Sequence, residues 1–224
     1  MQARPGLANS VDWRLYYVTD TDLSGGPEQV PHFVEQAVLG GAGVVQIRDK
    51  HLGHDDFLAL TRACMAANER AAMSVGRAAA IVVNDRLEVA AELGLHYHQG
   101  QDDGDIKRAR KLLGPDLLIG LSISSLQELE AELADQTADA LGLSPIWATP
   151  TKTDTAEALG IDGARELVVA TRRRAKTLAI GGINLVNGRW VIQTGVDGIC
   201  VVSAITSAPD PRDAATQLLG LWSD

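Results

Sequence analysis

Cysteine is scarce in this sequence, and the two that occur, Cys64 and Cys200, lie in apolar helical and strand-like surroundings. Such positions are typical of buried small hydrophobic residues, so neither a disulfide nor a cysteine metal site is predicted. The apolar runs are too short to cross a bilayer, and residues 1–13 contain no signal-peptide pattern. We therefore expect a cytoplasmic protein without a membrane segment.

Positive charge is also sparse, since the formal net charge is −9 and the dense basic run is confined to Arg172, Arg173 and Arg174. An acidic chain binds nucleic acid poorly unless its basic residues cluster. This run lies at the end of a predicted helix, where cations stabilise the terminal carbonyl groups. No nucleic-acid partner is therefore expected, and the sequence leaves open whether the chain is a monomer or a homo-oligomer.

Several nucleotide-binding and catalytic motifs are missing as well. The first strand-like run is followed by Thr19-Asp20-Thr21-Asp22, not by a glycine-rich G-x-G-x-x-G turn. The chain contains neither a G-x-x-x-x-G-K-[ST] motif nor a G-x-S-x-G elbow, and no order of serine, histidine and aspartate supports a hydrolase triad. These absences argue against an open, doubly wound nucleotide-binding sheet and against a hydrolase.

Short apolar runs alternate with helical patterns from one end of the chain to the other. Eight such pairs predict a parallel sheet, and eight strands can close into a barrel that their own side chains fill. We predict a single (β/α)₈ TIM barrel over residues 1–224, in which residues 1–12 form a flexible N-terminal extension. The open doubly wound sheet is the alternative. The expected strands are Leu15–Val18, Val44–Ile47, Ala78–Val83, Leu95–His98, Leu117–Leu121, Ala138–Leu143, Thr177–Ile180 and Gly198–Val202. The expected helices are Pro31–Leu39, Asp55–Met73, Leu87–Leu93, Ile106–Leu113, Leu126–Ala134, Gly163–Arg173, Leu185–Thr194 and Pro211–Leu219.

The second expected strand ends with three long polar side chains on one face, Gln46, Arg48 and Lys50. Residues at the C-terminal ends of the strands form the active site of a TIM barrel. A guanidinium and an ammonium side by side repel each other unless an anion lies between them, and phosphate is the natural partner. An exposed strand with a polar face is the alternative interpretation.

Carboxylates follow the third and fourth expected strands. Asp85 comes directly after Asn84, and Asp102 and Asp103 come after Gly100-Gln101. Two carboxylates that face each other repel unless a cation lies between them, and hard oxygen ligands suit Mg²⁺, which also takes water and phosphate oxygens. Alternatively, Asp85 is only the N-cap of the next helix.

Histidine and serine side chains occupy the next two strands. His96 and His98 form a His-x-His pair of the kind that can bind zinc, but no third ligand is evident nearby. We therefore expect both histidines to be hydrogen-bonded in the interior. Ser122 places a hydroxyl group near the mouth of the barrel, or else caps the helix that follows.

The last three strands lead into loops that suit phosphate. Residues 144–155 form a long, hydroxyl-rich loop that carries Lys152, and such loops are usually functional, although a merely solvated loop is the alternative. Gly181-Gly182 follows the seventh strand and Ser203 the eighth. Loops at these two positions form the recurring phosphate site of the fold, although the two glycines could instead serve a tight turn.

Together these strand ends resemble the thiamine phosphate synthase family over nearly the whole chain. The resemblance implies a transferase that joins hydroxymethylpyrimidine diphosphate to a thiazole phosphate and releases diphosphate. The matching motifs are Leu15-Tyr16-Tyr17-Val18-Thr19-Asp20, Gln46-x-Arg48-x-Lys50, Asn84-Asp85, Gly100-Gln101-x-Asp103, Gly120-x-Ser122, Thr149-x-Thr151-Lys152, Gly181-Gly182-Ile183 and Val202-Ser203-Ala204.

The resemblance also implies roles for individual residues. Asp85 and Asp103 are the expected Mg²⁺ ligands, with Asp102 as the alternative to Asp103. The family is thought to react through a pyrimidine-stabilised carbocation, and the absence of an evident nucleophile–base pair suits this mechanism. The expected catalytic residues are Arg48, Lys50, Ser122 and Lys152. The expected pyrimidine diphosphate contacts are Gln46, Arg48, Lys50, Asn84, Ser122 and Lys152, and the expected thiazole phosphate contacts are Thr149, Thr151, Gly182, Val202 and Ser203.

Two other functions remain in competition with this assignment. A thiazole tautomerase of the same superfamily is associated with a histidine at the position of Ser124, and it does not need the full set of diphosphate contacts. A non-catalytic phosphate-binding barrel would retain the anion site without turnover. The serine at position 124 argues against the tautomerase, and the presence of Asp85, Lys50 and Lys152 argues against a lost activity.

Overall fold

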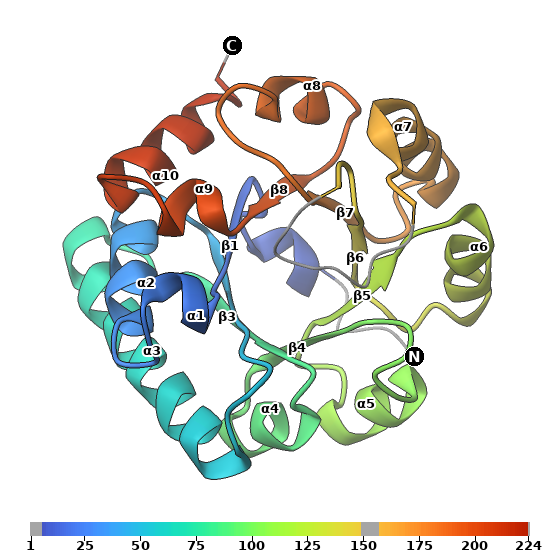
Figure 1. The fold of residues 1–224 in the computed structure, drawn as a ribbon. Coiled ribbons are helices and arrows are strands. Elements are labelled where there is room, and N and C mark those ends of the chain that lie inside the picture. Colours follow the sequence, from blue (N-terminus) through green and yellow to red (C-terminus); the bar gives the residue numbers. More distant parts are fainter. Residues whose placement is uncertain (1–5, 149–156, 224) are drawn as a thin grey trace.

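The chain folds into a closed barrel of eight parallel strands that follow one another in sequence order, with β8 paired to β1 (Figure 1). The structure is a computed structural model that describes residues 6–148 and 157–223. It confirms the predicted TIM barrel and excludes the open sheet. The strands are β1 Leu15–Val18, β2 Val44–Ile47, β3 Ala80–Asn84, β4 His96–Gln99, β5 Ile119–Ile123, β6 Ala140–Leu143, β7 Lys176–Ile180 and β8 Gly198–Val201.

Helices form a ring around the barrel (Figure 1). The expected helices are all present, although α8 is shorter than predicted and α7 lies a few residues earlier. The one-turn helices α1 and α9 were not predicted, because a single turn shows no 3.6-residue periodicity. Among the described residues, no helix is both long and apolar enough to cross a membrane. The helices are η1 Leu7–Ser10 (3₁₀), α1 Thr21–Ser24, α2 Val30–Leu39, α3 His54–Val75, α4 Leu87–Leu93, α5 Ile106–Leu113, α6 Leu126–Asp135, α7 Gly160–Thr171, α8 Gly188–Ile192, α9 Ser203–Thr206 and α10 Pro211–Gly220.

Alternation along the strands creates two separate layers of core. On β1, Tyr16 and Val18 belong to the cluster that fills the barrel, whereas Leu15 and Tyr17 belong to the layer between the barrel and the helices. The same alternation, continued beyond the end of β2, places the side chains of Gln46, Arg48 and Lys50 above the inner cluster at the C-terminal mouth. The inner layer thus forms the floor on which a polar site is built.

The N-terminal segment closes the opposite end of the barrel. Trp13 is buried, and its indole Nε1 donates a hydrogen bond to the carbonyl oxygen of Ala8 over 2.6 Å. Leu7, Ala8 and Val11 pack against the cluster inside the barrel. The described part of the expected N-terminal extension therefore packs against the barrel, and its flexibility stays a prediction.

Two glycines allow this segment to approach the strands closely. A Cβ atom on Gly198 would lie 2.0 Å from the carbonyl oxygen of Trp13, and one on Gly43 would lie 2.1 Å from that of Asp12. We expect Gly198→Ala to lower the free energy of unfolding by about 3 kcal/mol, because the obstructing atom is backbone and cannot turn away. Urea denaturation measures this loss. Gly220→Ala, with no atom within 4 Å of the added carbon, is the matched control, and equal stability of the two variants would contradict the prediction.

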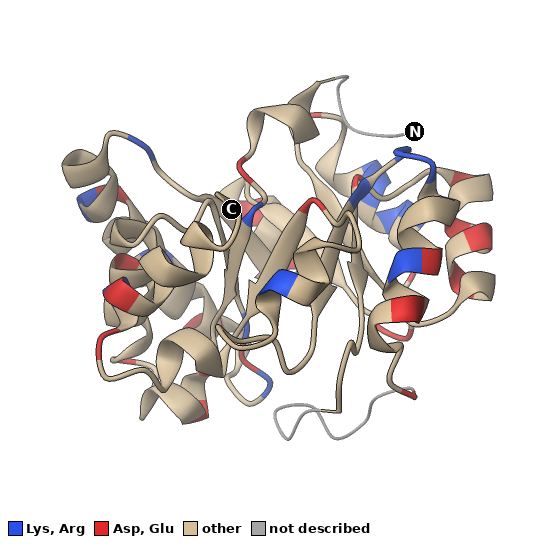
Figure 2. Ribbon diagram, turned by 90° about the horizontal axis from the view of Figure 1, so that it is seen from above, with Lys and Arg blue, Asp and Glu red and all other residues tan. Residues whose placement is uncertain are grey.

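A buried ion pair connects α5 to the segments that precede β5 and β6. Arg110 of α5 is 3% exposed, pairs with Asp139, and donates to the carbonyl oxygens of Leu117 and Thr137. Its setting differs from that of the other charges, because basic and acidic residues are intermixed over the outer helices, where water screens them (Figure 2). Arg110 therefore acts as an internal cross-link between the α5–β5 loop and the segment that enters β6.

Candidate active site

The ends of the strands enclose a cavity of about 190 Å³ at the C-terminal mouth of the barrel. Most of the residues that the sequence predicts for the site lie on its wall. Thr149, Thr151 and Lys152 fall outside the described residues, so their positions stay predictions. The predicted residues on the wall are Gln46, Arg48, Lys50, Asn84, Asp85, Asp103, Ser122, Gly182, Val202 and Ser203.

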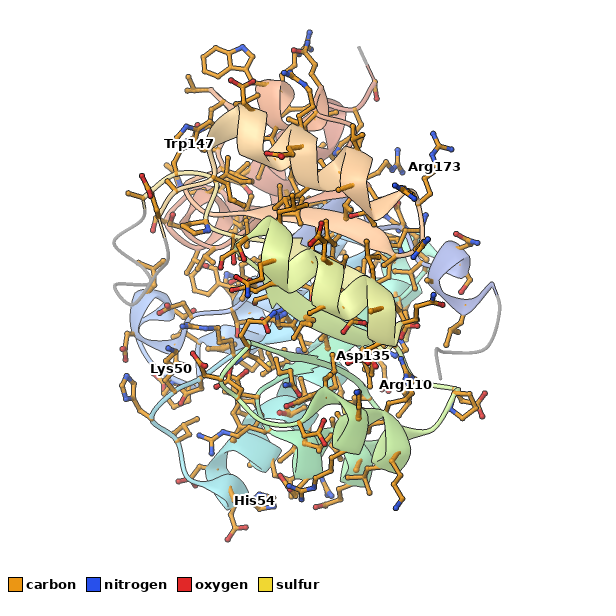
Figure 3. All side chains as sticks on the ribbon, turned by 90° about the vertical axis from the view of Figure 1, so that its right-hand side faces the viewer. Lys50, His54, Arg110, Asp135, Trp147 and Arg173 are labelled. Atoms are coloured by element: carbon orange, nitrogen blue, oxygen red, sulfur yellow. The ribbon has the colours of Figure 1, made fainter. Side chains whose placement is uncertain are left out.

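A larger hollow of about 940 Å³ lies at the other end of the molecule, lined in part by Arg172–Arg174 and Lys176. Figure 3 shows Lys50 and Trp147 toward one end of the barrel and Arg110 and Arg173 toward the other. The larger hollow contains none of the predicted site residues, and the N-terminal face of a TIM barrel serves stability, not catalysis. We therefore take the smaller cavity as the candidate active site.

Gln46 is fixed in the floor of this cavity. It is buried, and its Nε2 donates a hydrogen bond to the hydroxyl oxygen of Tyr16 over 2.8 Å. Burial raises the pKa of Tyr16, so this hydroxyl stays neutral and can accept the bond. The amide of Gln46 is thus held in one orientation, which suits recognition of a planar polar ring. Tyr16, which lines the cavity, was given no role in the predictions.

Arg48 and Lys50 supply the positive charge of the wall. Arg48 lies partly buried above Gln46, and Lys50, further along the chain, is exposed at the rim. The backbone N–H of Arg48 donates to Thr19 Oγ1 over 2.9 Å, which ties the end of β2 to the end of β1. Two cations on one side of a small cavity attract an anion with more than one charge, as the sequence predicts.

Asp85 and Asp103 bring two carboxylates to the adjoining wall. The backbone of Asp85 is left-handed, with φ of 58°, and the residue before α4 is Arg86, so the N-cap alternative for Asp85 is wrong. Asn84 Nδ2 donates to Asp85 Oδ2 over 2.5 Å, and the N–H of Gly100 donates to Asp103 Oδ2 over 2.8 Å. Burial, and then the nearby Asp103, raise the pKa of Asp85 to about 6. The cavity therefore contains a negative pair that a cation would stabilise.

The donors of this pair fit a magnesium ion. Both side chains offer hard carboxylate oxygens, and Asp103 lines the cavity, whereas Asp102 is not on its wall. Among the described residues, no group of three or more histidine, cysteine, aspartate or glutamate side chains could hold a metal. A magnesium ion on Asp85 and Asp103 would therefore complete its shell with water and with phosphate oxygens of a substrate.

A hydroxyl–imidazole pair lies deeper in the cavity. His98 Nε2 is 3.1 Å from Ser122 Oγ, and glycines make room for the ring, because a Cβ on Gly120 would lie 2.4 Å from His98 Nδ1. The alternative that Ser122 caps a helix is wrong, since Ser125 caps α6. The sequence does not predict this contact, because it depends on β4 and β5 lying side by side. His96 Nδ1 accepts a hydrogen bond from the N–H of Leu118, which confirms the predicted hydrogen-bonded role for this residue, whereas His98 lines the cavity.

Glycine and hydroxyl groups form the remaining side of the cavity. Gly181 and Gly182 have φ of 115° and 68°, and a Cβ on Gly181 would lie 2.9 Å from the backbone nitrogen of Ile146. The two glycines therefore serve a tight turn against the segment after β6, and Gly182 also lines the cavity with Val202 and Ser203. The tight-turn interpretation of the Gly-Gly motif is confirmed, and the phosphate interpretation stays a prediction.

Comparison with known proteins identifies the family. The family model described as thiamine monophosphate synthase matches residues 15–205, which include all eight strands. The chain belongs to this family. The thiamine-phosphate synthase of Albidiferax ferrireducens is 42% identical over 209 residues, which are 92% of this chain and 90% of that protein. The synthase of Chloroflexus aurantiacus is 40% identical over 218 residues, covering 97% and 96% of the two chains.

The solved structures and the longer relatives agree with this membership in the thiamine monophosphate synthase family. A thiamine phosphate pyrophosphorylase from Pyrococcus furiosus matches with a TM-score of 0.81 and 30% identity, covering 95% of this chain and 96% of its own. The thiamine biosynthesis multifunctional protein ThiED of Corynebacterium efficiens is 42% identical over 222 residues. The match covers 94% of this chain but 29% of that protein, so the chain spans less than a third of the multifunctional relative.

Proposed function

We propose that this chain is a thiamine-phosphate synthase, which joins hydroxymethylpyrimidine diphosphate to a thiazole phosphate and releases diphosphate. The observation that carries the proposal is the division of the cavity wall into two unlike sides. Arg48, Lys50 and two carboxylates lie on the β2–β4 side, and Gly182 and Ser203 lie on the β7–β8 side. Two anion-binding sides in one mouth suit two phosphorylated substrates, and full-length relatives of this name support that choice.

The β2–β4 side is suited to the departure of diphosphate. Arg48 and Lys50 place fixed positive charge where negative charge develops on the leaving oxygen, which is the largest contribution a site of this kind can make. Asp85 and Asp103 would hold Mg²⁺, which when bound supplies further positive charge to the diphosphate. Lys152 is predicted to act on the same group from the loop after β6.

The deeper residues position the pyrimidine. Gln46, held by Tyr16, and the His98–Ser122 pair present fixed polar atoms to a ring that lies on the inner cluster. Positioning of this kind favours a reaction through a pyrimidine-stabilised carbocation, because the thiazole nitrogen attacks only if the two rings face each other. Thr149 and Thr151 are predicted to join Gly182, Val202 and Ser203 around the thiazole phosphate.

The test is product formation from the two phosphorylated halves, followed by mass spectrometry. We expect thiamine phosphate and diphosphate to form with Mg²⁺, to be absent after treatment with a chelator, and to return when Mg²⁺ is added in excess. The dependence follows because the carboxylate pair has no compensating cation among the described residues of the wall other than Arg48 and Lys50. Failure to form product with any divalent metal would exclude the synthase.

The thiazole tautomerase remains the second candidate, but the structure does not favour it. Ser124 stands at the position of the tautomerase histidine, and its N–H and Oγ bond to Glu128 over 2.6 and 2.9 Å. The hydrogen bonds of this serine therefore go to the first turn of α6. A cytoplasmic location remains a prediction from the sequence alone.

A further inference from the structure

A carboxylate that was not predicted for the site, Asp20, lies beside Arg48 at the edge of the cavity. Asp20 Oδ2 is 3.8 Å from Arg48 Nη1, and the two side chains are 17% and 19% exposed. Both residues line the cavity. Water screens a pair of this burial less than it screens the exposed pairs on the outer helices, so the attraction between these two charges is the stronger.

Asp20 is itself held in place by the backbone. Its Oδ1 accepts a hydrogen bond from the N–H of Leu23 over 3.0 Å, as the N-cap of α1, which leaves Oδ2 facing Arg48. The main chain of Arg48 is tied to the neighbouring residue, because its N–H donates to Oγ1 of the buried Thr19 over 2.9 Å. The segment after β1 therefore holds the backbone of Arg48 by a hydrogen bond and places a carboxylate beside its side chain.

A second attraction acts on Arg48 from across the cavity. Asp85 and Asp103 form a negative pair on the adjoining wall of the same small cavity that Arg48 lines. A long side chain without an anchor would turn toward these carboxylates. In that position it would neutralise the place where a cation is expected to bind.

We propose that Asp20 is a positioning residue, which holds the guanidinium of Arg48 away from Asp85 and Asp103 and directed at the departing diphosphate. This inference rests on the proposed function. Asp20 is not a catalytic residue, since it acts through Arg48. The one-turn helix α1 contributes to this role, because its N-terminus holds the carboxylate of Asp20 at the edge of the cavity.

The variant Asp20→Asn separates positioning from folding, because asparagine is as good an N-cap as aspartate and so preserves α1. We expect kcat to fall by about tenfold to a hundredfold, the effect of a misplaced group. The KM for the pyrimidine diphosphate is expected not to rise, since the substitution also removes a negative charge close to the substrate phosphates. A loss that lies in kcat alone is the signature of positioning.

Asp210→Asn provides a matched control. Asp210 caps α10 through Asp213 N at 2.9 Å, in the same way that Asp20 caps α1, but it does not line the cavity. We expect this variant to retain the kcat of the wild type. A fall in kcat equal to that of Asp20→Asn would show that the effect comes from helix capping and would overturn the proposal.

A double-mutant cycle with Arg48→Ala tests whether Asp20 acts through Arg48. The double variant is expected to have the same kcat as Arg48→Ala alone, because a guanidinium that is absent needs no anchor. If the two losses multiply in full, Asp20 does not act through Arg48. The cycle is repeated with inorganic diphosphate and Mg²⁺ by calorimetry, where Arg48→Ala should cost less affinity in the Asp20→Asn background. Equal losses of affinity in the two backgrounds would refute the positioning role. If the wild type made no thiamine phosphate, that separate result would refute only the proposed function.

Discussion

Asp85→Asn and Asp103→Asn should each lower kcat by about a hundredfold or more, because each removes a formal negative charge from the pair that would hold the cation. Asparagine keeps the size of the side chain and one oxygen, so the cavity keeps its shape. The concentration of Mg²⁺ that gives half-maximal rate should rise in both variants. Steady-state rates measured over a series of Mg²⁺ concentrations give both quantities.

Asp102→Asn is the control for this experiment, and it also decides between the two adjacent aspartates. Asp102 has the same chemistry and lies one residue before Asp103, but it is not on the wall of the cavity. We expect its kcat and Mg²⁺ requirement to match those of the wild type. If Asp102→Asn lost activity and Asp103→Asn did not, the second ligand would be one residue earlier than proposed.

Arg110→Ala should lower the free energy of unfolding by about 3 to 5 kcal/mol, the cost of leaving one partner of a buried ion pair without the other. The side chains of Arg110 and Asp139 are 4% and 6% exposed, so the pair is largely shielded from water. The carbonyl oxygens of Leu117 and Thr137 would lose their donor as well. Chemical denaturation, followed by circular dichroism, measures the change.

Arg108→Ala, two residues earlier on α5, is the control for Arg110→Ala. Arg108 pairs with Glu88 over 3.2 Å, but the two side chains are 69% and 64% exposed. An exposed pair of this kind contributes less than about 1 kcal/mol. Similar losses of unfolding free energy in the two variants would mean that the buried Arg110–Asp139 pair stabilises the fold no more than an exposed pair does.

The sequence predicted the barrel because its elements are regular and each is defined locally. Runs such as Val44–Ile47 are apolar throughout, as strands covered on both faces must be, and β1 and β2 begin and end where predicted. Arg110 shows where local patterns fail. In the sequence it is one of several basic residues on a polar helix, and its burial depends on carbonyl groups and a carboxylate that come later in the chain.

The site was predictable in part for the same reason. Alternation along one strand placed Gln46, Arg48 and Lys50 together, and the structure brings them to the cavity. Asp20 and Arg48, by contrast, follow different strands, β1 and β2, and a Thr-Asp-Thr-Asp run predicts helix capping as readily as a contact with an arginine. The pairing of His98 with Ser122 was missed because it depends on the register between β4 and β5, which the chain does not show locally.

Trp13 and the N-terminal segment close the base of the barrel, and this closure limits how ligands could reach the candidate active site. Since the described N-terminal residues close the base, both substrates of the proposed reaction would enter and both products would leave through the C-terminal mouth. Gln46 on β2 lies deeper than Arg48, which follows that strand, so in the proposed reaction a pyrimidine bound at Gln46 would have to enter before the thiazole phosphate. The joined product of the proposed reaction would occupy the same passage and would have to leave before the next pyrimidine could bind.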